Sequence, residues 1–288
     1  MQFKIRELER KDFPKKLLQI PDCPKTLRAV GELPPEDRKW LSVVGSRKFT
    51  NYGKEAVEKL IGGLSGYPIV IVSGLALGID SIAHKTALSA GLKTVAVPGS
   101  GLSPKVLYPS TNLRLAEKIL SEGGALLSEF ENNFKATPWS FPQRNRIMAG
   151  LSNAVMVVEA ETKSGTLITS RLATEYNRDV FAVPGPIFSK TSEGPHMLIR
   201  LGATPIASPK NILDALGFKT DEENEPVKKD YSDCSPKEKQ IIEALSEPVS
   251  RDELIRATKL QISELNSLLT ILEIKGLIKE FMGEIHLS

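Results

Sequence analysis

Short apolar runs and amphipathic stretches alternate along residues 40–206. The runs cover residues 41–44, 69–72, 94–97, 125–127, 155–158 and 180–183. They are rich in Val, Ile and Leu and nearly continuous, as in strands that are covered on both faces. Stretches with a helical spacing of apolar residues cover 53–64, 81–90, 113–120 and 167–176. Strands that alternate with helices predict an α/β, Rossmann-like fold with a doubly wound, mostly parallel sheet.

The flanking segments break this rhythm and divide the chain into four parts. Residues 1–38 hold five prolines, which oppose long helices and regular sheet, so we expect an irregular N-terminal segment lying on the main domain. Residues 39–218 form the expected Rossmann-like domain, and the polar, acidic residues 219–234 are typical of a flexible linker. Residues 235–288 are expected to form a separate module.

The pattern of this last module is that of a winged helix. Helices are predicted over residues 236–245, 250–257 and 261–275, and a hairpin that turns at Gly283 follows them. Ser235 and Pro236 are a helix start, because serine caps the first turn and proline suits its first position. Three helices followed by a hairpin are the winged-helix arrangement.

Composition narrows the class of protein. The chain has 288 residues, of which 41% are hydrophobic and 25% charged, as in ordinary globular domains. No apolar run approaches the roughly 20 residues of a membrane helix, and the start of the chain has no signal-peptide pattern. Its two cysteines, Cys23 and Cys234, are too far apart in sequence for a typical metal motif. We therefore expect a cytoplasmic protein without a metal, a disulfide scaffold or a membrane contact.

The net charge of +3 is the sum of a basic N-terminal part and an acidic C-terminal part of the chain. Residues 219–234 carry three Lys and six Asp or Glu, and residues 235–288 carry seven Lys or Arg and nine Asp or Glu. The remaining residues, 1–218, therefore have a net charge of +8. A surface that attracts a polyanion is expected on the Rossmann-like domain.

A helix start in the middle of the chain concentrates the candidate chemistry. Residues 141–146 read Phe-Pro-Gln-Arg-Asn-Arg and precede an apolar strand pattern. Helix N-termini attract anions, and the guanidinium groups of Arg144 and Arg146, on either side of Asn145, can each bind phosphate in a bidentate fork. Phe141 and the preceding Trp139 could stack on exposed bases. The alternatives are arginines paired with carboxylates, a Phe141 packed in the core and a Trp139 that covers a sheet edge.

Further anion-binding elements follow other predicted strands. Arg47 comes after the first strand and Gly74 after the second, and Lys163, Ser164 and Gly165 come before a predicted helix. Because the carboxyl ends of parallel strands share one edge, these residues are expected to meet there, although each alone also suits an ordinary tight turn. Neither a complete phosphate loop nor a dinucleotide fingerprint is present, so no cofactor is expected. A basic edge without nucleotide motifs favours a nucleic-acid backbone as the ligand, and single strands leave their bases free to reach the aromatic residues.

The same edge of the predicted sheet supports catalysis less well than it supports nucleic-acid binding. Asp80 and His84 could form an acid–base pair, but no nucleophile has a fixed place beside them. We expect Asp80 to cap a helix and His84 to pack or bond locally. The sequence therefore favours a protein that is not an enzyme.

Taken together, these motifs resemble the DprA/Smf family of bacterial DNA-processing proteins. The resemblance covers about residues 41–206. It rests on the sequences SGLALGIDSIAH at 73–84, YPSTNLRL at 108–115, FPQRNRIMAGLS at 141–152, SGTLIT at 164–169 and RDVFAVPG at 178–185. The chain departs from the family pattern at His196, where Asn is usual, at Ser103, where Asp is common, and at Pro138, where some relatives have lysine.

The resemblance implies a homodimer that binds single-stranded DNA and helps to load RecA recombinase during natural transformation. By the same resemblance, Arg47, Arg144, Arg146 and Lys163 would hold phosphates. Gly74, Ser164 and Gly165 would offer backbone or hydroxyl donors, and Phe141 would lie beside a base. For the C-terminal module we favour a contact with a partner or a second subunit over DNA reading, because its lysines are scattered and its net charge is −2.

Two rival functions belong to other classes. Residues 98–101 and 164–166 faintly resemble the glycine-rich motif of phosphoribohydrolases that share this type of sheet, but neither is followed by the expected acid. A sequence-specific repressor would need a basic recognition helix in the C-terminal module, and no such helix is predicted.

Overall fold

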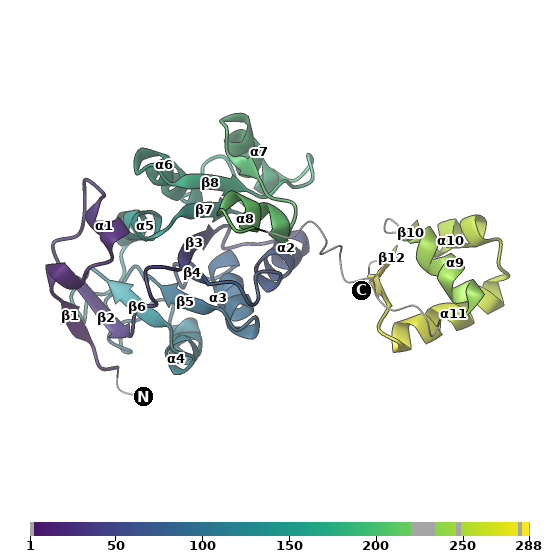
Figure 1. Ribbon diagram of the computed structural model, residues 1–288, viewed down its shortest axis with the longest axis horizontal. Coiled ribbons are helices and arrows are strands. Elements are labelled where there is room, and N and C mark those ends of the chain that lie inside the picture. The colour runs from purple at the N-terminus through teal and green to yellow at the C-terminus, as the bar shows by residue number, and fades with distance from the viewer. Residues whose placement is uncertain (1–2, 220–233, 246–248, 282–283, 288) are drawn as a thin grey trace. The chain divides into compact units, whose positions relative to one another are not determined.

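The computed structural model describes residues 3–219, 234–245, 249–281 and 284–287 and divides the chain into two compact units, residues 1–220 and 221–288 (Figure 1). The expected linker, residues 219–234, lies outside the described residues except for its two ends. Among the described residues, no helix is both long and apolar enough to cross a lipid bilayer.

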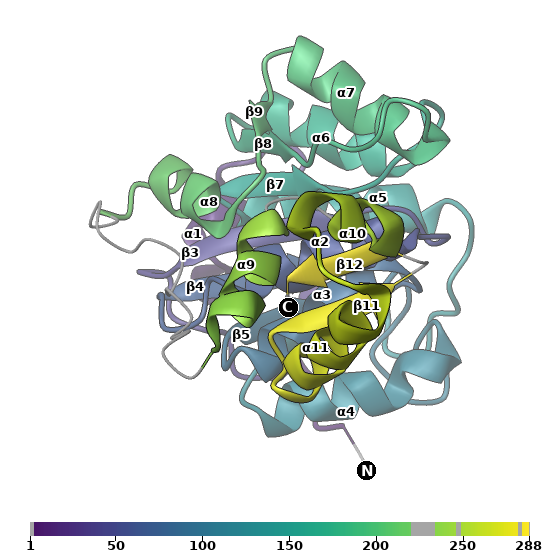
Figure 2. The same ribbon diagram turned by 90° about the vertical axis from the view of Figure 1, so that its right-hand side faces the viewer.

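A nine-stranded sheet organises the first unit. Its strands are β1 (Arg6–Leu8), β2 (Leu27–Gly31), β3 (Lys39–Val44), β4 (Ile69–Ser73), β5 (Lys93–Ala96), β6 (Ala125–Ser128), β7 (Ala154–Val157), β8 (Asp179–Ala182) and β9 (Thr204–Pro205). They lie in the order β1-β2-β6-β5-β4-β3-β7-β8-β9, and Figure 2 shows β8, β7, β3, β4 and β5 following one another across the unit. All pairings from β6 to β9 are parallel. The predicted Rossmann-like, mostly parallel sheet is confirmed.

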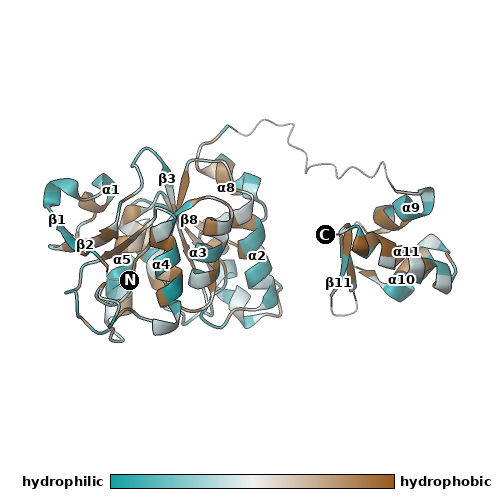
Figure 3. Cartoon of the chain, turned by 90° about the horizontal axis from the view of Figure 1, so that it is seen from below, coloured by the Kyte–Doolittle hydropathy of each residue, from teal (hydrophilic) through white to brown (hydrophobic). Residues whose placement is uncertain are grey.

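Helices cover both faces of this sheet. The helices are α1 (Lys15–Leu18), α2 (Asn51–Gly62), α3 (Ile79–Ser89), α4 (Leu113–Ser121), α5 (Ser140–Leu151), α6 (Thr166–Glu175), α7 (Glu193–Arg200) and α8 (Pro209–Ala215). Residues of α1, α5, α6 and α7 share one buried cluster with the sheet, and residues of α2, α3 and α8 share another. Successive residues of a strand point to opposite faces, so the nearly continuous apolar runs supply both cores. In Figure 3 the strands are largely brown and the outer sides of the helices are teal.

The N-terminal segment differs from its prediction. Residues 1–38, expected to be irregular, contribute β1 and β2 to the edge of the sheet, where β2 pairs antiparallel with β6. The reason is the position of the prolines. Pro24 and Pro34 flank β2 without interrupting it, so its backbone donors remain available for pairing.

The second unit has the winged-helix elements that the sequence predicts. Helices α9 (Pro236–Ala244), α10 (Arg251–Thr258) and α11 (Ile262–Ile274) enclose a small apolar core with strands β11 (Ile278–Phe281) and β12 (Glu284–Leu287). A short strand that the sequence did not indicate, β10 (Val249–Ser250), adds to β12. The expected turn at Gly283 lies outside the described residues.

The order of the strands creates a switch point in the first unit, next to β3. From β3 the chain continues to β4 on one side, whereas β7 joins β3 on the other. Ligands of doubly wound sheets bind outside the carboxyl ends of the strands at such a switch point.

Candidate nucleic-acid interface

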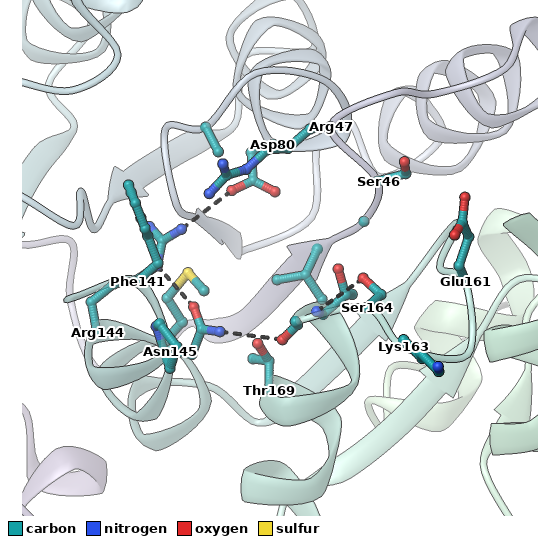
Figure 4. Close-up of a pocket in the computed structure, with 17 residues that line it drawn as sticks. Ser46, Arg47, Asp80, Phe141, Arg144, Asn145, Glu161, Lys163, Ser164 and Thr169 are labelled. Carbon is teal, nitrogen blue, oxygen red and sulfur yellow. Dashed lines mark hydrogen bonds and ion pairs between the residues drawn. The ribbon is translucent and has the colours of Figure 1, made fainter. Parts of the chain in front are cut away.

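A pocket of about 340 Å³ opens at this switch point (Figure 4). Four segments line it: the loop after β3, the segment from the loop after β4 to the start of α3, the helix α5, and the loop that leads from β7 into α6. Of the predicted site residues, the structure brings Arg47, Phe141, Arg144, Asn145, Lys163, Ser164 and Gly165 together in its lining. Gly74 and Arg146 are not lining residues. Segments separated by more than a hundred residues in sequence thus form one concave surface.

Arg47 and Lys163 supply the accessible positive charge. Both side chains are exposed, and neither has a carboxylate partner among the residues that the structure describes. The guanidinium carbon of Arg47 lies 4.8 Å from the centre of the Phe141 ring, a cation–π contact that holds the cation at the pocket mouth. The exposed Glu161 is the nearest negative group on the same loop as Lys163.

Arg144 is a different kind of cation, because only 5% of it is exposed. One terminal nitrogen donates to the carbonyl of Gly74 at 2.6 Å and to that of Val97. Its Nε donates to Asn145 Oδ1 at 2.9 Å, and its other terminal nitrogen lies 3.9 Å from a carboxylate oxygen of Asp80. These contacts fix the guanidinium at the base of the pocket.

Burial opposes the charged form of both members of the Arg144–Asp80 pair. Burial lowers the pKa of Arg144 to about 10, against the opposing effect of Asp80, so the guanidinium stays protonated at neutral pH. Burial also raises the pKa of Asp80. The charge of Arg144 and the hydrogen bond from the Gly74 N–H act in the opposite direction and lower it. Because the Arg144 guanidinium is engaged by protein oxygens, most of the net attraction for an anion comes from the exposed cations.

Gly74 has a packing role that the sequence does not reveal. Its N–H donates to Asp80 at 3.0 Å and its carbonyl accepts from Arg144, so both backbone groups are already used. A Cβ at this position would collide with the Arg144 guanidinium. Glycine is therefore needed here for the close approach of an arginine.

The floor of the pocket carries an unsatisfied donor that the sequence analysis missed. Thr169 is 1% exposed, and its Oγ1 has no hydrogen-bond partner in the described part of the chain. Figure 4 shows it in the pocket lining close to Asn145, whose Nδ2 contacts the Gly165 carbonyl at 3.5 Å. A buried polar group without a partner costs free energy, so a ligand atom that bonds Thr169 would bind more tightly. Its position one helical turn after Gly165 is the signal that could have identified it.

Ser164 and Gly165 form the entry to α6. Gly165 precedes the helix, and Ser164 Oγ accepts from the N–H of Thr166 at 3.2 Å. The partial positive charge of a helix N-terminus is therefore directed at the pocket, next to Lys163.

Arg146 lies on the other side of α5. Its guanidinium forms ion pairs with Glu129 and, at 3.8 Å, with Asp22, and it donates to the Asp22 carbonyl at 2.6 Å. These bonds hold the N-terminal segment against α5. The expected alternative, arginines paired with carboxylates, thus holds for Arg146 and also for Arg144, which pairs with Asp80.

The Asp80–His84 pair is not formed. Asp80 bonds Gly74 and Arg144 instead of capping α3, whose N-cap, Gly78, makes no side-chain cap bond. His84 is buried, its Nδ1 lies 2.7 Å from Thr94 Oγ1, and burial lowers its pKa to about 3. The local packing expected for His84 is confirmed, and the helix cap expected for Asp80 is wrong. His196, at the departure from the family pattern, bonds the Gly185 carbonyl at 3.0 Å.

Comparison with known proteins decides the family. Residues 4–217 match the sequence family described as DNA recombination-mediator protein A, and residues 225–283 match the DprA winged helix domain. The chain belongs to the DprA/Smf family. The resemblance drawn from the motifs is thereby confirmed, and the C-terminal module is a winged helix domain of that family.

Individual relatives agree with this assignment. Protein Smf of Escherichia coli is 44% identical over 206 residues, which are 72% of this chain and 54% of that protein, so the match spans about half of its length. DNA processing protein DprA of Streptococcus pneumoniae is 44% identical over 72% of both chains. The X-ray structure of the pneumococcal protein superimposes with a TM-score of 0.69 at 41% identity over 76% of each chain. DprA of Helicobacter pylori, described with a single-stranded DNA binding mode, gives a TM-score of 0.66 at 32% identity over 75% of this chain and 98% of that one.

Proposed function

We propose that this chain binds single-stranded DNA at the pocket between β3, α5 and α6 and acts as a recombination mediator without catalysis. The observation that carries the proposal is the pair of exposed cations, Arg47 and Lys163, at the mouth of a pocket whose floor holds the buried Thr169 hydroxyl. Among the described residues, neither cation has a carboxylate partner and the hydroxyl has no hydrogen-bond partner. The proposed contacts are Arg47, Phe141, Arg144, Asn145, Lys163, Ser164, Gly165 and Thr169. Gly74 and Arg146 act as positioning residues, through Arg144 and the N-terminal segment respectively.

The dimensions and lining of the pocket favour an unpaired strand. A volume of about 340 Å³ is at the small end of ligand sites and is far too small for a duplex. Phe141 is partly exposed in the lining, where its ring can receive an unstacked base. The described single-strand binding mode of the Helicobacter pylori relative, which shares the fold, supports the same ligand.

The biological setting is proposed from the family. We infer a cytoplasmic homodimer that holds an incoming strand and delivers it to RecA recombinase during natural transformation. Membership of a family described as recombination mediators supports this role. A pull-down of RecA with the full chain, with and without single-stranded DNA, tests the partner, and light scattering tests the dimer.

The salt dependence of binding tests the nature of the contact. Arg47 and Lys163 would neutralise about two phosphates, which predicts a slope of roughly −1.5 for log Kobs against log salt concentration. If Arg144 and Arg146 each also met a phosphate, the slope would be near −3. Fluorescence anisotropy of a labelled oligothymidylate, titrated from low to moderate salt, gives this slope. An affinity that does not change with salt, or equal affinity for a duplex of the same length, would contradict the proposal.

A further inference from the structure

Aromatic side chains continue beyond the pocket at the beginning of α5. Trp139, immediately before the helix, is 55% exposed, and Tyr108, from the loop after β5, is 47% exposed. The Tyr108 ring lies 5.6 Å from the Phe141 ring, which lines the pocket. Single exposed aromatic residues occur elsewhere in this unit, such as Phe49 and Phe188, but Trp139 and Tyr108 lie on either side of a ring that lines the cationic pocket, in sequence or in space.

Two phenylalanine rings, Phe130 and Phe134, hold Trp139 in place. Its indole lies edge-on to Phe130 at 5.8 Å and to Phe134 at 5.5 Å, and those two rings stack on each other at 4.5 Å. These contacts fix the orientation of the indole while more than half of the residue remains accessible. A residue that merely covered the two phenylalanines would not need so much free surface.

The turn that carries these rings is also rigid. Ser140 is fully buried, and its Oγ donates to the Gly99 carbonyl at 2.6 Å and accepts from the N–H of Thr137 at 3.1 Å. A Cβ on Gly99 would lie 2.6 Å from the Phe141 ring, so that ring packs directly on the backbone after β5. Rings that are already immobilised lose little conformational entropy when a ligand stacks on them.

We propose that Trp139 and Tyr108 are base-stacking platforms outside the pocket, which receive the nucleotides next to the one that enters it. This inference rests on the proposed function and extends it. The pocket has room for about one nucleotide, so its neighbours on the same strand must lie on the adjoining surface. Lys105 and Lys135 are exposed on the loops that carry Tyr108 and Trp139. Cations combined with aromatic faces suit a single strand of any sequence.

The two tryptophans of the chain allow a direct test. Trp40 is 3% exposed in the core, and Trp139 is the accessible one. An oligothymidylate of about 20 nucleotides, labelled at one end, is titrated into the full chain while label anisotropy and indole fluorescence are recorded together. Stacking on Trp139 should quench the indole emission in step with binding. Trp139→Phe should remove that quenching and retain binding, because a phenyl ring still offers a stacking face.

Affinity provides the second measurement. Trp139→Ala and Tyr108→Ala should each weaken binding about fivefold or more, since stacking contributes roughly 1–3 kcal/mol per base. The matched control is Tyr67→Ala. Tyr67 lies just before the amino end of β4, whereas the pocket lies at the carboxyl ends of the strands, and its ring packs on Phe218. Thermal unfolding of each variant monitors the fold.

The outcomes separate this inference from the proposed function. Binding accompanied by unchanged indole fluorescence, or an unaltered affinity of a folded Trp139→Ala variant, would overturn the stacking platform and leave the pocket proposal intact. Failure of the labelled oligonucleotide to bind the wild-type chain would overturn both.

Discussion

The pocket and the winged helix module both carry basic residues, but they use them differently. In the module, Lys237 pairs with Glu264 and Arg251 with Glu280, both across exposed surface. In the pocket, Arg47 and Lys163 have no carboxylate partner within the described ranges. A cation attracts phosphate only to the extent that no nearby carboxylate already neutralises it. The comparison supports the proposal that DNA binds at the pocket, and it separates Arg47 and Lys163 from the paired cations Lys237 and Arg251.

Burial adds a second difference. The Arg144–Asp80 pair lies at the base of the pocket with both side chains less than a tenth exposed, whereas the Lys237–Glu264 and Arg251–Glu280 pairs of the module are in contact with water. An exposed pair contributes at most about 1 kcal/mol. Removing one partner of a buried pair leaves an uncompensated charge and costs much more.

The largest effect is expected at this buried pair. Arg144→Met should lower the free energy of unfolding by about 3–5 kcal/mol, because Asp80 would remain buried without its partner. Urea denaturation of the full chain measures the loss. Arg144→Met combined with Asp80→Asn should recover part of it, since the charge that lacked compensation is then absent. Equal stability of the single variant and the wild type would show that the pair is not buried as described.

Next in size is the effect of removing a free cation. Arg47→Ala should weaken single-stranded DNA binding by roughly 10- to 100-fold, the range for a hydrogen bond to a charged group, and should do so for every sequence. Stability should change little, because the side chain is exposed. Anisotropy with oligothymidylate and with a mixed-sequence strand measures both points. Arg171→Ala is the matched control, because that exposed arginine pairs with Glu175 within α6. A loss confined to one base sequence would contradict a phosphate contact.

The smallest effect is expected in the module. Arg251→Ala should change DNA affinity by less than about twofold and stability by at most about 1 kcal/mol, because its guanidinium is exposed and already paired. The same anisotropy and denaturation measurements apply. A loss as large as that of Arg47→Ala would remove the distinction between the two regions and make the module part of the DNA site.

The helix start at residues 141–146 shows how far sequence reasoning reaches. The motif correctly predicted that α5 begins here, and the positions of strand ends correctly placed Arg47 and Lys163 on one edge. It could not separate Arg144 from Arg146. Residues two apart on a helix point in different directions, and only the packing of α5 decides that one reaches the pocket and the other reaches Glu129.

The sequence by itself determined the alternation of strands and helices, the separate winged helix module and the family, because these depend on local periodicity and contiguous motifs. The tertiary structure alone decided which charges remain free. Asp80 meets Arg144 across 64 positions of sequence, and β2 pairs with β6, which follows it only after three intervening strands. Within the described ranges, the Thr169 hydroxyl has no hydrogen-bond partner. Pairing and burial are properties of groups brought together in space, and the free energy of each depends on neighbours that linear order does not specify.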